Sequence, residues 1–176
     1  MASVPLTLTT IDATAHHEAG HAVLAISTGI MQVYAPITYA AGSKAAVPLM
    51  GMTSRSNRFT MRGGTEAHFD DMMATVSAGG FAAEWRYHQD AWHVPNGAQM
   101  QCGAYGDLAS IVSVFGSGHW DAFRAKADVV ISDPVIWDAV QKLASVLLLT
   151  WPNPVSVAAV YATVGHVDPG FPMLSL

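Results

Sequence analysis

The chain of 176 residues contains a single cysteine, Cys102. A disulfide needs two cysteines, so an internal disulfide framework is excluded, and such sparing use of cysteine is typical of a reducing compartment. We therefore expect a cytoplasmic protein. At this length, residues 1–176 are expected to form one domain whose hydrophobic core is large enough to be stable without cross-links.

Charged residues are scarce as well. Asp, Glu, Lys and Arg make up 12% of the chain, whereas an average soluble domain has about 25%. With 8 Lys and Arg residues and a net charge of −5, the chain has no basic patch for a phosphate backbone, so we expect no nucleic-acid partner. A surface with so few charges favours contact with another subunit, and a homo-oligomer is therefore one expectation.

Long apolar runs are missing too. A membrane-spanning helix needs about 20 consecutive apolar residues, and the densest apolar run, from Leu143 to Trp151, is too short. The first segment, MASVPLTLTTID, lacks a basic start followed by a continuous apolar stretch. We therefore expect neither an integral membrane segment nor a signal peptide.

Helical patterns dominate the sequence. The spacing of apolar and small residues predicts helices over residues 11–28, 65–87, 107–115, 125–131, 135–149 and 155–164, with a loop over 88–106. Two short strands are predicted within residues 31–40 and 45–54. Gly79 and Gly80 cost the second helix about 1 kcal/mol each in helix propensity, and such a pair allows another backbone to approach closely. The expected fold class is α+β, mainly helical, with a small sheet.

One motif in the first predicted helix carries chemistry: His17-Glu18-Ala19-Gly20-His21, an H-E-x-x-H. Residues four apart lie on one helical face, so both histidines can bind one ion, and Glu18 lies beside them where it can accept a proton from a metal-activated water. So short a motif also arises by chance. Here it lies in an apolar helix, where three ionisable groups are costly to bury without a partner, and this favours a metal, with Zn2+ as the expected cofactor.

A catalytic zinc needs a third protein ligand and leaves the fourth position to water. Few acidic residues follow the motif. The spacing leaves Glu84 and Asp107 as the best candidates, because both lie in or beside segments rich in small apolar residues, where a lone carboxylate would be expensive.

Three segments in order resemble the FtsH-type zinc metallopeptidase domain, over about residues 10–115. They are HEAGHA at residues 17–22, GGFAAE at residues 79–84 and GAYGDLAS at residues 103–110. The resemblance implies a zincin-like peptidase fold, with His17, His21 and Asp107 as zinc ligands and Glu18 as the catalytic base. For Glu84 it implies a structural role, in which this side chain holds one of the ligand residues in position.

The resemblance also implies how a substrate binds, along an edge strand near the metal. The corresponding segment is residues 47–53, so Met50, Gly51, Met52 and Thr53 are the expected substrate-binding residues, holding a peptide by main-chain hydrogen bonds. FtsH proteins carry membrane spans and an AAA+ ATPase module before the peptidase domain. This sequence has no GxxxxGK[ST] loop, so the expected substrates are short or unstructured peptides.

Three functions stay open. The first is a zinc-dependent peptidase, and the second a zinc enzyme that tailors a small molecule or peptide by hydrolysis or another zinc-assisted step. The third is a non-catalytic, metal-stabilised binding domain, against which Glu18 argues because zinc binding alone needs no base. Other candidates are weaker. His16 should miss the metal, and Cys102 is a weak candidate for a thiolate ligand. Three side chains are weak candidates for stabilising an oxyanion, namely His93, Tyr105 and His119.

Overall fold

The computed structural model describes residues 11–29, 31–38, 49–50, 65–91 and 105–169. Within these ranges the fold is mainly helical, as predicted. The helices are α1 (Ile11–Ser27), α3 (Glu66–Asp90), α5 (Tyr105–Phe115), α6 (Trp120–Ser132), α7 (Pro134–Thr150) and α8 (Val157–Val164), followed by a 3₁₀ turn, η2 (Gly165–Val167). Two antiparallel strands, β1 (Gln32–Val33) and β2 (Leu49–Met50), pair with Gln32 opposite Met50.

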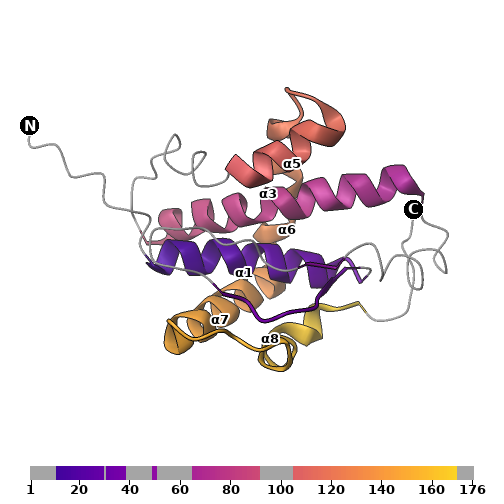
Figure 1. The fold of residues 1–176 in the computed structure, drawn as a ribbon. Helices are drawn as coiled ribbons and strands as arrows, with labels where there is room; N and C mark the ends of the chain where they lie inside the picture. The colour runs from indigo at the N-terminus through magenta and orange to yellow at the C-terminus, as the bar shows by residue number, and fades with distance from the viewer. Residues whose placement is uncertain (1–10, 30, 39–48, 51–64, 92–104, 170–176) are drawn as a thin grey trace, which may run out of the picture.

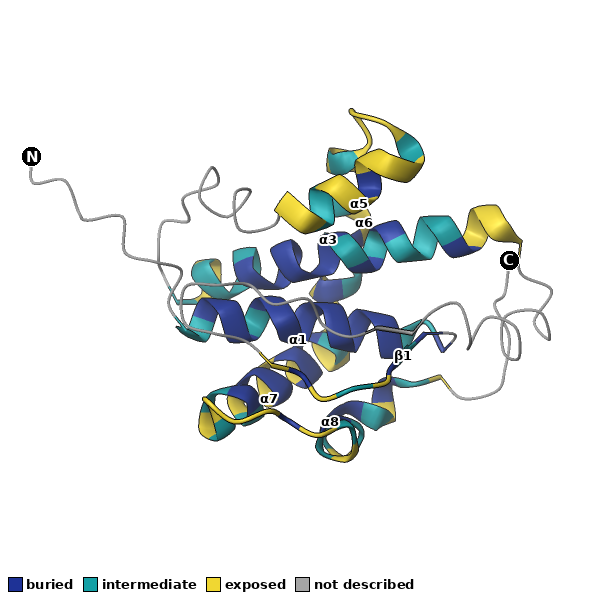
Figure 2. Ribbon diagram, in the orientation of Figure 1, coloured by how far each residue is buried: buried dark blue, intermediate teal, exposed yellow. Residues whose placement is uncertain are grey.

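Helix α1 lies at the centre of the molecule, between α3 and α7 (Figure 1). Almost every residue from Ala13 to Ile26 is buried, and many of them are alanine. Small side chains on several faces allow neighbouring helices to approach on each side, so α1 is covered along its length (Figure 2). The H-E-x-x-H motif is therefore part of the core.

The contact between α1 and α3 depends on glycine. A Cβ atom added at Gly20 would lie 2.5 Å from the carbonyl oxygen of Gly79 and 2.6 Å from the Cβ of Ala83, closer than packed atoms allow. The backbones of the two helices thus approach each other at Gly20 and Gly79, which confirms the close approach predicted for the glycine pair. This approach brings the backbone of α3 up to the histidine face of α1.

Two helix boundaries differ from the sequence prediction by three residues or more. Helix α3 continues through Asp90, whose carboxylate accepts a hydrogen bond from Trp137 Nε1 at 3.0 Å, so a long-range contact holds the last turn. Helix α6 begins at Trp120 instead of residue 125, and its preceding residue, His119, makes no capping hydrogen bond with its side chain. The sequence therefore offered no N-cap signal, and burial of Phe123 on this added turn helps to hold it.

Helix α5 lies against α3, and most of its surface is exposed (Figures 1 and 2). Ile111 is its only fully buried residue, although the helix is largely apolar. In the part of the chain that the structure describes, no helix is both long and apolar enough to cross a membrane.

Candidate metal centre

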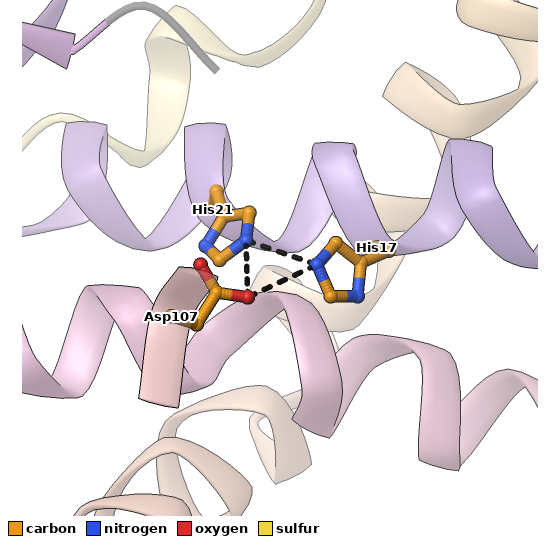
Figure 3. A group of neighbouring side chains, drawn as sticks. All are labelled: His17, His21 and Asp107. Carbon is orange, nitrogen blue, oxygen red and sulfur yellow. Dashed lines mark hydrogen bonds and ion pairs between the residues drawn. The ribbon is translucent and has the colours of Figure 1, made fainter. Parts of the chain in front are cut away.

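His17 and His21 on α1 and Asp107 in the first turn of α5 meet at one point beside α3 (Figure 3). The Nε2 atoms of the histidines are 3.2 Å apart, and the Oδ2 atom of Asp107 lies 3.2 Å from His17 Nε2 and 3.4 Å from His21 Nε2. The side chains of His17, His21 and Asp107 are 2%, 8% and 22% exposed, respectively. Three potential ligand atoms thus form a nearly equilateral triangle, and Asp107 is the most exposed of the three residues that supply them.

The size of this triangle fits a four-coordinate divalent ion. Zinc bonds to nitrogen and carboxylate oxygen are about 2.0–2.2 Å long, so two ligand atoms at tetrahedral angles are about 3.3 Å apart. The three observed separations, 3.2, 3.2 and 3.4 Å, agree with this edge length. Two imidazoles and one carboxylate also form a typical catalytic zinc donor set, which leaves a fourth position open.

The Nδ1 atom of each histidine, on the side of the ring away from the triangle, makes a contact that holds the ring in place. The Nδ1 atom of His21 lies 2.8 Å from the carbonyl oxygen of Val76, and that of His17 lies 3.0 Å from Oε2 of Glu84. A carbonyl oxygen can only accept, so Nδ1 of His21 donates its hydrogen, and in the neutral ring Nε2 keeps its lone pair for a metal. Glu84, which is fully buried, gives His17 the same orientation.

The charges of the site support one another. Burial lowers the pKa of His21, but the charge of Asp107 and its hydrogen bond, together with Glu18 and the Val76 carbonyl, outweigh burial and raise this pKa to about 9. Burial raises the pKa of Asp107, but the two histidines outweigh it and hold this pKa well below its usual range. Pairing with the Asp107 carboxylate therefore favours the protonated form of His21.

Gly80 forms the floor of the triangle. A Cβ atom at this position would lie 2.4 Å from Nε2 of His21 and 2.7 Å from Nε2 of His17. Any side chain here would therefore take the space of the two potential ligand atoms. The sequence predicted that a second backbone approaches this glycine pair, but it did not predict that Gly80 faces the histidine rings.

Glu18 lies on α1 next to His17 and is fully buried. Its charge acts on His21, where it helps to raise the pKa. A carboxylate at this place is a base held inside the core, beside the potential ligands.

The remaining sequence candidates lie elsewhere or outside the described residues. His16 points away from the triangle, as predicted: its Nδ1 atom lies 2.7 Å from the backbone oxygen of Asp12, and its ring stacks on Tyr87 at 4.2 Å. Tyr105 is 71% exposed at the start of α5, and His119 lies against Phe115. Met50 is in β2, whereas the other candidates are outside the described residues, namely Gly51, Met52, Thr53, His93 and Cys102.

Two contributors to the site were missed by the sequence analysis. The Val76 carbonyl that orients His21 is a backbone atom, so the residue type at position 76 carries no signal for it. Gly80 did carry a signal, a glycine in the middle of a helix, which usually marks a close contact.

No family model, no curated protein and no solved structure matches this chain. The likeness to FtsH-type peptidases is therefore carried by the three sequence segments alone.

Proposed function

We propose that this protein is a zinc-dependent peptidase with a zincin-like, FtsH-type site, and that it acts on short or unstructured peptides. The observation that carries the proposal is the triangle of His17, His21 and Asp107, whose edges match the spacing of three zinc ligands. Support also comes from the two contacts on the histidine Nδ1 atoms, because such outer contacts are typical of metal-binding histidines.

The residues divide the chemical work. Zinc held by His17, His21 and Asp107 would polarise a substrate carbonyl and make a water molecule more acidic. The carboxylate of Glu18 accepts a proton from the attacking water and then donates it to the nitrogen of the leaving amine. Burial of Glu18 keeps bulk water away from that proton. Glu84 keeps the Nδ1 hydrogen of His17 in place, so Nε2 stays directed at the metal position.

Substrate peptides would bind along the strand that contains Met50. Strand β2 pairs with β1 through Leu49 and Met50, and β1 contacts α1, which carries the histidines. A peptide that adds to this strand through main-chain hydrogen bonds would extend along the residues that follow, Gly51 to Thr53. Main-chain recognition needs an extended substrate, which is why short or unstructured peptides are proposed.

The test is cleavage of an unbiased peptide mixture, read by mass spectrometry. We expect new termini from the zinc-loaded protein, none after the metal is removed, and none from Glu18→Gln although it still binds zinc. Glu66→Gln is the matched control, because Glu66 is exposed in the first turn of α3 and the same substitution there should leave cleavage unchanged.

Two results would overturn the proposal. Cleavage by Glu18→Gln at the rate of the unmodified protein would remove Glu18 from the chemistry. Absence of cleavage by protein shown to hold zinc would favour a small-molecule or tailoring reaction, or a binding role for the metal-stabilised domain.

A further inference from the structure

A groove runs between α3, the helix that carries Gly80, and α5, the helix that carries Asp107. It has a volume of about 340 Å³, within the range of small ligand sites, and is lined chiefly by Phe69, Met73 and Ala74 of α3 and by Ser110, Val114 and Phe115 of α5. The two helices lie side by side in Figure 1, with α5 on the outside of α3.

Both walls of the groove lead to the metal triangle. On α3, Ser77 follows Val76, the partner of His21, and precedes Gly80 by three residues. On α5, Ser110 follows Asp107 by three residues. Three helical residues advance about 4.5 Å, so the end of the groove formed by the two serines lies about one helical turn from the potential ligands.

The groove extends away from that end. From Ser77 back to Asp70, α3 covers seven residues, or about 10 Å. This length exceeds the reach of a single side chain from its backbone. A residue whose carbonyl is bound at the triangle could therefore place its whole side chain between α3 and α5.

The lining has serines at the end near the metal triangle, apolar side chains in its middle and an acidic residue at the far end. The hydroxyl of Ser110 donates to the Gly106 carbonyl at 2.9 Å, and that of Ser113 to the Ser110 carbonyl at 2.8 Å, so both donors are used within α5. Among the described residues that line the groove, Asp70 at the far end is the one charged residue. An apolar occupant fits such walls, whereas an acidic side chain would meet both desolvation and the charge of Asp70.

We propose that this groove is the specificity pocket of the site and takes a large apolar side chain, such as that of leucine, methionine or phenylalanine, from the residue whose carbonyl the metal binds. The inference rests on the proposed function because it assigns the substrate class of the same site. Peptides with an apolar residue at the cleaved bond are then preferred, glycine is poor, and glutamate is poorest.

The first test measures binding without turnover, by calorimetry on the zinc-loaded protein with three probes: the α-hydroxamates of leucine, glycine and glutamate. Each probe binds zinc through the same group, so the differences report the groove alone. Burial of a leucine side chain is expected to make its hydroxamate bind roughly 10- to 100-fold more tightly than that of glycine. The glutamate compound should bind more weakly than the leucine compound by at least as much.

Ser110→Phe fills the end of the groove next to the metal, and we expect it to abolish the preference for leucine over glycine. Ser145→Phe is the matched control: Ser145 is an exposed serine on α7, and its hydroxyl donates to the carbonyl four residues earlier, as that of Ser110 does. The control should keep the full preference. Asp70→Asn, an exchange without added bulk, should reduce the difference in affinity between the glutamate and leucine hydroxamates.

The binding results can overturn the groove proposal and the peptidase proposal separately. Equal binding of the leucine and glycine probes, or a preference that survives in Ser110→Phe, would overturn the groove proposal. A clear leucine preference in a protein that cleaves no peptide would support the groove and refute the peptidase. Failure of all three hydroxamates to bind the zinc-loaded protein would refute both.

Discussion

Helices α1 and α3 hold their part of the site inside the core, whereas α5 brings Asp107 to it from the surface. The side chains of the two histidines and the two glutamates of α1 and α3 are at most 8% exposed, whereas that of Asp107 is 22% exposed. Helix α5 has one fully buried residue, Ile111, and three of its apolar side chains are exposed, namely Tyr105, Val112 and Val114. One site is thus shared by a tightly packed region and a weakly packed one.

This difference separates the tasks of the two regions. Helices with many buried contacts open only with global unfolding, whereas a helix with few buried contacts opens locally at low cost. The core half holds the rings of His17 and His21 through buried contacts of their Nδ1 atoms. The α5 half supplies the third potential ligand and one wall of the groove, and some mobility there would be compatible with entry of the proposed substrate.

The largest expected difference between the two regions concerns zinc binding after one glycine in each region is replaced by alanine. Gly80→Ala would place its Cβ 2.4 Å from Nε2 of His21, so we expect zinc binding to be lost and the free energy of unfolding to fall by about 1–3 kcal/mol. Gly106→Ala on α5 is the matched change, because a Cβ there meets nothing within 4 Å. It should keep full zinc binding, measured as metal content after gel filtration.

The two variants, Gly80→Ala and Gly106→Ala, can also contradict the comparison between a rigid core half and a weakly packed α5. Normal zinc content in Gly80→Ala would mean that α1 and α3 separate easily and that the core half is not rigid. Loss of zinc in Gly106→Ala would mean that α5 is held as tightly as α3.

The second effect is the competition between protons and zinc for His21. Because its pKa is about 9 in the metal-free protein, a proton must leave when zinc binds, and the apparent affinity for zinc should fall about tenfold for each pH unit below 9. Chelator competition between pH 7 and pH 9 should therefore show a change of roughly 100-fold. Asp107 stays ionised across this range because its pKa is lowered.

The stability of the metal-free protein should change in the opposite direction. A pKa raised from 6.5 to about 9 by folding contributes stability that is complete below pH 6.5 and is lost as the pH rises through 9. The difference in melting temperature between zinc-loaded and metal-free protein should consequently grow with pH. A constant difference over this interval would show that His21 is not protonated in the metal-free site.

The third effect concerns the contact between Glu84 and His17 within the core half. Glu84→Gln keeps the shape of the side chain but removes its charge, and loss of such an outer contact typically weakens metal affinity about 10- to 100-fold. Glu66→Gln, in the exposed first turn of the same helix, is expected to leave the affinity unchanged. Equal affinities of the two variants would show that Glu84 has no part in holding the ligand.

The two regions also differ in how far the sequence predicted them. The spacing within H-E-x-x-H is a local property, so the placement of His17 and His21 on one helical face followed from helix geometry alone. Asp107 is 86 residues after His21, and spacing left it level with Glu84. The family likeness separated the two, and the structure places Asp107 on the Nε2 side of the rings and Glu84 on the Nδ1 side.

Packing between distant segments was the part that the sequence could not supply. The groove between α3 and α5 combines residues around position 73 with residues around position 112, and no periodicity within either helix encodes their alignment. The start of α6 was misplaced for a related reason, because its first turn has no side-chain cap. Local patterns therefore predicted the shared face of His17 and His21 better than the packing around it.

The smallest expected effect is an increase in the local opening of α5 when zinc is removed. Hydrogen exchange of the backbone amides measures this opening. At pH 7 the protonated His21 still pairs with Asp107, so protection of α5 should fall only modestly, by roughly tenfold, while that of α1 stays the same. Above pH 9 His21 becomes neutral and the ion pair weakens, so after correction for intrinsic exchange rates the loss of protection in α5 should be larger. Equal losses in α1 and α5 would mean that the metal stabilises the whole helical core. A loss confined to α5 would show that the third ligand holds this helix in place.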